Sequence, residues 1–450
     1  MAAAQAAAAI ALPMNSHMQA CYHLVGVSGK IAPITIRERL AIPEPRLAEA
    51  LRHLSARPGI AESIILCTAS RTEVLVAAKG EGSEPRRFLD KLGEFPAGEL
   101  SPYLYEHRER SAVRHLFRVT AGLDDAPLRG TGGLRLIRHA CTVARAEGTL
   151  GRRLGLLTDH AFSAARRVRK ETWMGTSSVS VAAVVNELAN RIAGSISGLK
   201  ICLVGDGGFA EDAARQLLAR GAGELFVVSW HHGEPTSLAA RLGLREFRPE
   251  ELYEVCHLAD IVITCVGAQS PLFRRAHGEA FLAHRRNRPM IFADLALPRD
   301  VHPEMGALDG IFVFNIDDIQ EIASRQLSPL NEGIQEAEAI IDEEVDRFHA
   351  RLNAASVVPA IISLRRHLES IRQHEMRRLA KRLALLSAEQ RSVLDDMTLR
   401  MVNKVAHSSS TTLRAMGDLP GSAAQVAMVA RIFGLPAQSE FREETDGMAA

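Results

Sequence analysis

Gly205, Gly207 and Ala210 have the types and the spacing that the phosphate-binding turn of a dinucleotide site requires. Glycine in the first place allows a tight turn, and glycine in the second lets the backbone approach a pyrophosphate. Alanine in the third place lets a helix pack closely on a strand, and the free N–H groups of that helix can bind phosphate. The residues predicted to contact a cofactor are therefore Gly205, Gly207, Gly208 and Ala210.

The pattern around this turn, residues 200–230, supports the same prediction. An apolar run at 201–204 is typical of a buried strand, a helical pattern follows the glycines, and a second apolar run lies at 225–228. The whole segment is about thirty residues long, as a β-strand–helix–β-strand unit requires. We predict a Rossmann unit here, and a Rossmann fold that no longer binds its nucleotide is the alternative.

Composition places the chain among ordinary globular proteins of two or three domains. It has 450 residues, of which 47% are hydrophobic and 24% are charged. No apolar run approaches the roughly 18 residues of a membrane helix, so a cytoplasmic protein is expected. The six cysteines show no paired spacing, which argues against zinc and disulfides.

Charge is unevenly spread, although the net charge is only +1. Residues 129–170 carry ten Lys and Arg against two acids, and residues 317–346 carry ten acids against one base. A basic segment of this density suits a polyanion such as RNA, because phosphate contacts supply most non-specific nucleic-acid affinity. A solvated helix face, balanced by the acidic segment, is the alternative.

Periodic apolar patterns predict a small α/β unit before the Rossmann unit. Strands are expected at 22–27, 64–67 and 73–76, with a loop at 68–72, and helices at 43–54, 85–94 and 111–121. A helical pattern then covers 134–193, with breaks near 148–151 and 175.

The Rossmann unit is expected to span 196–316, with further strands at 261–264 and 290–294. From 317 to 413 the pattern is helical. Pro329 and Gly333 are predicted to kink this helix and Pro359 to open its successor.

A series of motifs, collinear along residues 22–415, is similar to one known enzyme family. The motifs are Ala32-Pro33, Arg37-Glu38, Thr68, Arg71-x-Glu73, 112–124, 168–172, 179–182, 259–262, 294–300 and 315–318. In these blocks the chain resembles glutamyl-tRNA reductase. That family uses NADPH to reduce glutamyl-tRNA to glutamate 1-semialdehyde, the first step of the five-carbon route to tetrapyrroles.

The resemblance implies a multi-domain α/β fold and a set of partners. An N-terminal α/β catalytic-type domain is expected at 21–165, a Rossmann NADP-binding domain at 166–316, and a long spinal helix with a C-terminal all-α dimerisation domain at 317–415. A disordered extension is expected at 1–20 and a flexible tail at 416–450. The implied cofactor is NADPH. The implied partners are glutamyl-tRNA, a second copy in a homodimer, and the aminomutase that acts next.

The chain departs from the family at the nucleophile. In the family a cysteine thiolate within a Thr-Cys-Asn-Arg segment attacks the ester carbonyl and forms a thioester, but this chain reads Thr68-Ala69-Ser70-Arg71. Cys67 is the candidate substitute, and in an extended chain its side chain would point to the same side as residue 69. Two residues of strand displace a side chain by about 6.6 Å, whereas reacting atoms must lie about 3–3.5 Å apart. A core role for Cys67 is the alternative.

The pocket for the glutamyl group has also changed. A serine of the family is Asp125 here, and the family's Gly-Glu-x-Gln aligns with residues 129–132, which place Gly130 and Gly132 at its two polar positions. Thr68 and Arg71 are kept as the residues expected to bind the substrate, and the resemblance implies that Arg71 pairs with the glutamate side-chain carboxylate. His115 is also kept, as a proton donor or an orienting group, or as a helix histidine without a catalytic role.

The residues that would choose the cofactor are unusual. The second Rossmann strand ends in Ser229-Trp230-His231-His232 and lacks the family's Asn-Arg, and Asp206 adds negative charge to the glycine turn. NADPH is thus expected by resemblance alone. Three functions compete. The first is an active or partly active but impaired glutamyl-tRNA reductase, in which Cys67 or the substrate geometry compensates. The second is a catalytically inactive binding or regulatory member, and the third is a reductase of another acyl donor.

Overall fold

The structure, a computed structural model, describes residues 21–78, 82–96, 98–124, 132–172, 180–205, 208–230, 237–326, 331–417, 428 and 431–433. The extension predicted at 1–20 and most of the predicted tail lie outside these residues. The chain forms two compact units, Met1–Glu343 and Glu344–Ala450.

The first unit begins with a four-stranded antiparallel sheet in the order β2-β3-β1-β4. The strands are β1 (Cys21–Ser28), β2 (Ile60–Thr68), β3 (Arg71–Ala78) and β4 (Tyr105–Arg108). Every residue of β3 is buried, which fits a strand in the interior of a sheet that is covered on both faces. The three strands predicted from the sequence are confirmed, and β4 was missed because its Tyr-Glu-His-Arg sequence carries no apolar alternation.

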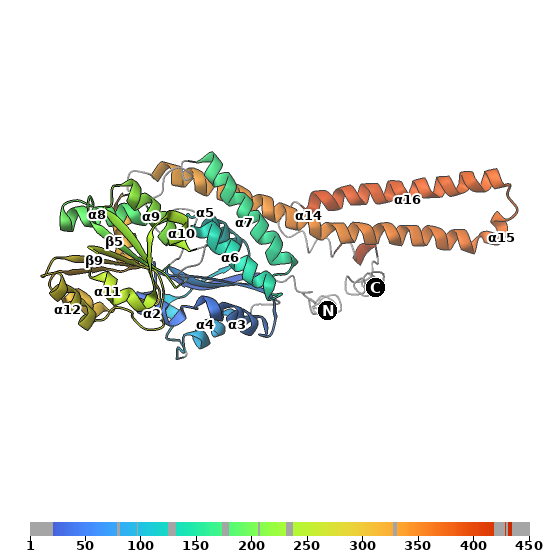
Figure 1. The fold of residues 1–450 in the computed structure, drawn as a ribbon. Helices are drawn as coiled ribbons and strands as arrows, with labels where there is room; N and C mark the ends of the chain where they lie inside the picture. The colour runs from blue at the N-terminus through green and yellow to red at the C-terminus, as the bar shows by residue number, and fades with distance from the viewer. Residues whose placement is uncertain are drawn as a thin grey trace, which may run out of the picture. The chain divides into compact units, whose positions relative to one another are not determined.

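Helices cover both faces of this sheet (Figure 1). They are α2 (Ile34–Leu40), α3 (Glu44–Ser55), α4 (Glu84–Leu92), α5 (Arg110–Ala121), α6 (Gly132–Ala146) and α7 (Arg152–Glu171). Figure 1 shows α3 and α4 on one side of the sheet and α5, α6 and α7 on the other. The break predicted near 148–151 separates α6 from α7, while residue 175 lies outside the described residues.

A six-stranded parallel sheet in the order β10-β9-β8-β5-β6-β7 follows within the same unit. Its strands are β5 (Lys200–Val204), β6 (Glu224–Val228), β7 (Arg245–Phe247), β8 (Ile261–Thr264), β9 (Met290–Asp294) and β10 (Ile311–Phe314). The strand order reverses between β5 and β8, where doubly wound folds bind their ligands.

Helices complete the doubly wound arrangement around the parallel sheet. They include α8 (Val181–Ala193), α9 (Gly208–Ala219), α10 (Leu238–Leu242), α11 (Leu252–Cys256), α12 (Arg275–His284) and α13 (Ile316–Gln326). The predicted strands are confirmed. The edge strand β7 was missed because it is only three residues long and two of them are charged. The edge strand β10 was missed although its four residues are all apolar.

The second unit is helical, and α14 (Asn331–Arg378) enters it from the first. The prediction that Pro359 opens a new helix was wrong, because α14 runs through that position to Arg378. A proline removes one backbone hydrogen bond from a helix, and a helix as long as α14 keeps its other hydrogen bonds on both sides of that position. Gly333 lies in the first turn of α14 rather than at a kink, and Pro329 lies outside the described residues.

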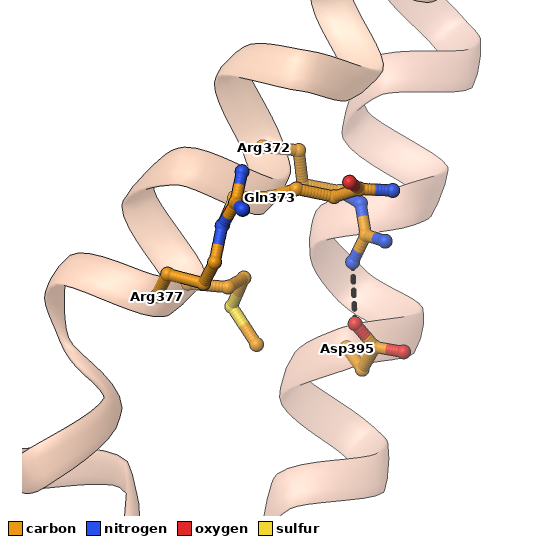
Figure 2. Close-up of a pocket in the computed structure, with 5 residues that line it drawn as sticks. Arg372, Gln373, Arg377 and Asp395 are labelled. Atoms are coloured by element: carbon orange, nitrogen blue, oxygen red, sulfur yellow. Dashed lines mark hydrogen bonds and ion pairs between the residues drawn. The ribbon is translucent and has the colours of Figure 1, made fainter.

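Beyond α14 the chain reverses through α15 (Ala380–Leu383) into α16 (Ala388–Gly417). Arg372 of α14 forms an ion pair with Asp395 of α16, beside the shallow pocket that Gln373 and Arg377 also line (Figure 2). Within the described part of the chain, no helix combines the length and the apolar composition needed to cross a membrane.

Candidate active site

The hairpin between β2 and β3 carries the position at which the family has its nucleophile. Thr68 pairs with Arg71 in the ladder, so the loop expected at 68–72 is in fact a two-residue turn of Ala69 and Ser70. The Thr68 hydroxyl accepts the backbone N–H groups of Ser70 at 3.3 Å and Arg71 at 3.2 Å. The Gly29 N–H donates to the Ser70 carbonyl at 2.8 Å. These bonds fix the turn from both sides.

Ala69 is turned toward the dinucleotide-binding part of the first unit. Its side chain is half-buried and packs against the apolar cluster that also contains Leu203 and Ala210. Its carbonyl accepts a hydrogen bond of 2.6 Å from Nη1 of Arg37. The position at which the family requires a sulfur is thus placed next to the domain expected to hold the hydride donor, but its side chain is a methyl group.

Cys67 lies on the strand and has different neighbours. Its Sγ accepts the Ile42 N–H at 3.4 Å and lies 3.6 Å from the Thr72 hydroxyl. Burial raises the pKa of the Cys67 thiol. The thiolate is the reactive form, so this environment disfavours attack by Cys67. Because Ala69 belongs to the turn, the strand alternation that would align the two side chains does not reach it.

A buried hydrogen-bond network lies behind the turn and centres on Glu73, whose side chain is fully buried. Its Oε1 accepts from Nη1 of Arg71 at 2.8 Å and lies 2.9 Å from Nε2 of His115, and the Tyr105 hydroxyl also donates to it. Burial by itself would raise the pKa of Glu73, but Arg71 and His115 outweigh it and lower the pKa to about 2. An ionised Glu73 therefore holds His115 in place.

His115 is itself nearly buried at 7% exposure, and its ring stacks on His107 with the ring centroids 4.6 Å apart. Burial, and then the neighbouring His115, lower the pKa of His107. The sequence placed Arg71 and His115 in one site, and the structure brings them together through Glu73. Glu73 was not among the predicted site residues, although it stands in the Arg71-x-Glu73 motif that could have indicated it.

Arg71 is only 2% exposed and is shared with a second acid, Asp124. Its Nη1 lies 3.0 Å from Oδ2 of Asp124, whose other oxygen accepts from Nζ of Lys30 at 2.8 Å. Burial would raise the pKa of Asp124, but Arg71 and Lys30 hold it well below its usual range. The guanidinium expected to bind a substrate carboxylate thus has two carboxylates of the protein beside it. Asp125 and Gly130 lie outside the described residues, and Gly132 begins α6.

The dinucleotide turn follows β5. Gly205 has φ = 101°, and a Cβ there would lie 3.2 Å from both Cys265 Sγ and Val266 Cγ2, so the turn requires glycine. Gly208 begins α9, and Ala210 is buried in the core against the sheet. The backbone conformation at Gly205 and the close packing at Ala210 are those that the first and third positions of a dinucleotide-binding turn require. Gly207, Asp206 and His231-His232 lie outside the described residues.

Three models of known families match successive parts of the chain. They are the N-terminal domain of glutamyl-tRNA(Glu) reductase at 25–172, shikimate/quinate 5-dehydrogenase at 187–322, and the dimerisation domain of glutamyl-tRNA(Glu) reductase at 336–435. The protein named glutamyl-tRNA reductase 2 of Koribacter versatilis (strain Ellin345) is 40% identical over 414 residues, which are 92% of this chain and 95% of that protein. The chain belongs to the glutamyl-tRNA reductase family.

A second relative agrees with this assignment. The glutamyl-tRNA reductase of Solibacter usitatus (strain Ellin6076) is 34% identical over 92% of this chain and 99% of that protein. A solved structure of the Methanopyrus kandleri glutamyl-tRNA reductase, 26% identical, aligns with 93% of this chain and all of that one at a TM-score of 0.48. The family and three-part fold predicted from the sequence are confirmed. The dehydrogenase-type domain indicates a nicotinamide cofactor, and the dimerisation domain supports a homodimer.

Sequence reasoning missed a second residue of this reductase fold, Asp300. Its carboxylate accepts the N–H groups of Val266, Gly267 and Ala268 at 2.8–3.0 Å, and the Thr264 hydroxyl donates to it as well. It therefore fixes the loop after β8, which touches the glycine turn at Gly205. The sequence does hold one signal for Asp300, because this residue ends the motif at 294–300 that resembles the family.

Proposed function

We propose that this chain is a glutamyl-tRNA reductase in which catalysis is impaired. The reaction is the NADPH-dependent reduction of glutamyl-tRNA(Glu) to glutamate 1-semialdehyde, the entry to tetrapyrrole synthesis. The observation that carries the proposal is the position of Ala69. It stands at the turn where the family's chemistry begins and faces the dinucleotide-binding domain, but it has no sulfur. Arg71, two residues further on, pairs with the Glu73 that holds His115.

The residues that are present can still perform part of the reaction. Gly205, Gly207, Gly208 and Ala210 would hold the pyrophosphate of NADPH, which supplies the hydride when it is bound. His115, oriented by Glu73, would give a proton to the tRNA ribose oxygen as the ester C–O bond breaks, once the carbonyl carbon has taken up the hydride. Thr68 would bind the substrate from the turn that its hydroxyl also holds, where it accepts two backbone N–H groups.

A catalytically inactive binding or regulatory member of the family is the second candidate. It is favoured by Cys67, whose thiol packs on Ile42 and Thr72, and by Arg71, which Glu73 and Asp124 already engage. We propose for this candidate that Cys67 is a packing residue. The protein would keep its fold, its dimer and its contact with tRNA but would not catalyse the reduction. The downstream aminomutase would then be a binding partner of an enzyme-like scaffold.

Rapid mixing of the protein, NADPH and glutamyl-tRNA tests the proposal, with oxidation of NADPH followed by absorbance and the aldehyde trapped by a hydroxylamine. An impaired reductase gives slow oxidation with a matching amount of aldehyde. The inactive member gives none while still binding the tRNA. Oxidation as fast as that of a relative with the family cysteine would contradict impairment.

We expect tRNA to bind along α7. Arg152, Arg153, Arg166 and Lys170 are exposed on this helix, whereas Arg167 is engaged by Glu171 at 2.9 Å and Glu343 at 2.8 Å. Affinity measured by filter binding should therefore fall steeply as salt is added. Changing Arg166→Gln and Lys170→Gln together should lower the slope of log affinity against log salt by about 1 to 2.

The control for this experiment is Arg325→Gln on α13, which removes one cation from a different helix and should leave the slope unchanged. A binding curve that is indifferent to salt, or an Arg166/Lys170 variant that keeps the full slope, would show that α7 is only a solvated face.

We expect the protein to be a dimer in solution. The helix α16 exposes Val393, Met397, Met401 and Val405 at a spacing of four residues, with 64, 49, 61 and 49% of each exposed. Such a spacing places the four side chains along one face of the helix, and exposed apolar stripes of this kind mark interfaces. Light scattering at micromolar concentration should give about twice the chain mass of 49.0 kDa.

Met397→Glu together with Met401→Glu should shift this dimer toward monomer, because charges in an apolar interface are costly to bury. Gln390→Glu, which adds the same side chain at an exposed polar position of α16, should not. A wild-type protein that scatters as a monomer would overturn the assignment of this face.

A further inference from the structure

Arg37 of α2 is a fully buried guanidinium that joins Ala32, just before the start of its own helix, to two distant segments of the first unit. Its Nε donates to the Ala32 carbonyl at 3.2 Å and its Nη1 to the Ala69 carbonyl at 2.6 Å. Its Nη2 donates to both carboxylate oxygens of Asp317, to Oδ1 at 2.6 Å. Asp317 lies in the first turn of α13, directly after the last strand of the dinucleotide-binding sheet.

The next residue, Glu38, makes the opposite pairing. Its carboxylate accepts from Nε and Nη2 of Arg299 at 2.7 and 2.9 Å and from the Arg299 backbone N–H at 3.0 Å. Two adjacent residues of α2 thus form opposite ion pairs with the dinucleotide-binding domain. Arg37 pairs with an acid, Asp317, and Glu38 pairs with a base, Arg299. Any shift of the contact would bring like charges together, so the pairing defines one register.

This contact has a consequence for the side chain at position 69. The carbonyl oxygen and the Cβ of one residue are joined by three covalent bonds, so the Arg37 nitrogen lies within roughly 6 Å of the Ala69 Cβ. Arg37 is paired with the carboxylate of Asp317, whose side chain is 38% exposed. Water therefore screens part of the negative charge of Asp317, whereas the guanidinium of Arg37 is buried. A permanent cation at this distance favours a thiolate over a thiol, as it does at reactive cysteines in general.

We propose that Arg37 is a positioning residue of this site: it clamps the turn at position 69 to the dinucleotide-binding domain and favours the anionic form of a nucleophile at that position. The assignment rests on the proposed reaction, yet it concerns a thiol and a turn that can be observed without turnover. Arg37 therefore preserves the electrostatic setting of a nucleophile that the chain has lost.

The test introduces the missing sulfur as Ala69→Cys and, as a matched control, places one at the next turn residue as Ser70→Cys. Alkylation by iodoacetamide is followed across pH by peptide mass spectrometry, which separates both from the native cysteines. The thiol at 69 should react at neutral pH at least tenfold faster than the thiol at 70. Adding Arg37→Gln should remove that advantage.

A second variant keeps the test decisive if Arg37→Gln does not fold. Asp317→Asn retains the cation but releases the clamp, so hydrogen exchange at residues 68–71 should rise several-fold, while Glu321→Gln on the same helix should leave it unchanged. Equal reactivity at 69 and 70, or unchanged exchange in Asp317→Asn, would overturn the proposal. Neither readout depends on reductase activity, so a failure of the proposed function would show separately as an absence of NADPH oxidation.

Discussion

A cell that lacks its own glutamyl-tRNA reductase is expected to stay dependent on 5-aminolevulinate when this chain is its only replacement. Alanine at position 69 cannot form a thioester, and the Cys67 thiol is packed against Ile42 and Thr72. The polar residues lost from the glutamyl pocket add to this effect. One well-placed charged hydrogen bond contributes about 1.5–3 kcal/mol, so the loss of two or three implies a rate lower by roughly a thousandfold or more.

Ala69→Cys alone should restore little growth, because the glutamyl pocket stays unbuilt and Arg71 stays engaged by Glu73 and Asp124. A relative that carries the family's Thr-Cys-Asn-Arg segment serves as the positive control. Growth of the unmodified chain that disappears with Cys67→Ala would contradict this prediction and identify Cys67 as a relocated nucleophile. Growth that survives Cys67→Ala would require hydride transfer without a covalent intermediate.

Glu73→Gln is expected to destabilise the protein by about 3–5 kcal/mol, the usual result of removing one partner of a buried ion pair. Glutamine preserves the shape of the side chain but removes the charge that faces Arg71 and His115, both nearly buried. Chemical denaturation followed by circular dichroism measures the change. Glu106→Gln on β4 removes an acid that is 40% exposed and should cost about 1 kcal/mol or less.

The same residue predicts how stability depends on pH. The pKa of Glu73 is lowered from 4.5 to about 2 in the folded protein. Its contribution is therefore fully present above about pH 4.5 and is lost as the pH falls through about 2. The free energy of unfolding should decline across this window in the wild-type protein and decline less in Glu73→Gln. Equal slopes in the two proteins would show that Glu73 does not carry the acid sensitivity.

The sequence was sufficient for the strands and turns whose residues carry strong local signals. The apolar runs at 201–204 and 225–228 became β5 and β6, and the spacing from Gly205 to Ala210 placed the turn and the helix between them. The edge strands β4 and β7 were not predicted because they are short and polar. A strand at the edge of a sheet needs no continuous apolar pattern.

The contacts of the site could be predicted only in part. Arg71 and His115 were recognised by type, but the acid that joins them was not, because a fully buried glutamate is uncommon and its burial depends on the tertiary structure. The bond between Arg37 and Asp317 links residues 280 positions apart, and no local pattern encodes such a pair. The two-residue turn at Ala69 likewise follows from the pairing of Thr68 with Arg71 rather than from turn-forming residues.

The central claim is that this family member keeps the reductase scaffold without its nucleophile. Its most direct test is intact-mass spectrometry after incubation with glutamyl-tRNA in the absence of NADPH. Without hydride, a family enzyme that forms a thioester accumulates the glutamyl group on its cysteine. This chain is expected to show its unmodified mass, while a relative with the family cysteine gains one glutamyl group under the same conditions. A glutamyl adduct on this chain, mapped by proteolysis to Cys67 or to any other residue, would contradict the claim.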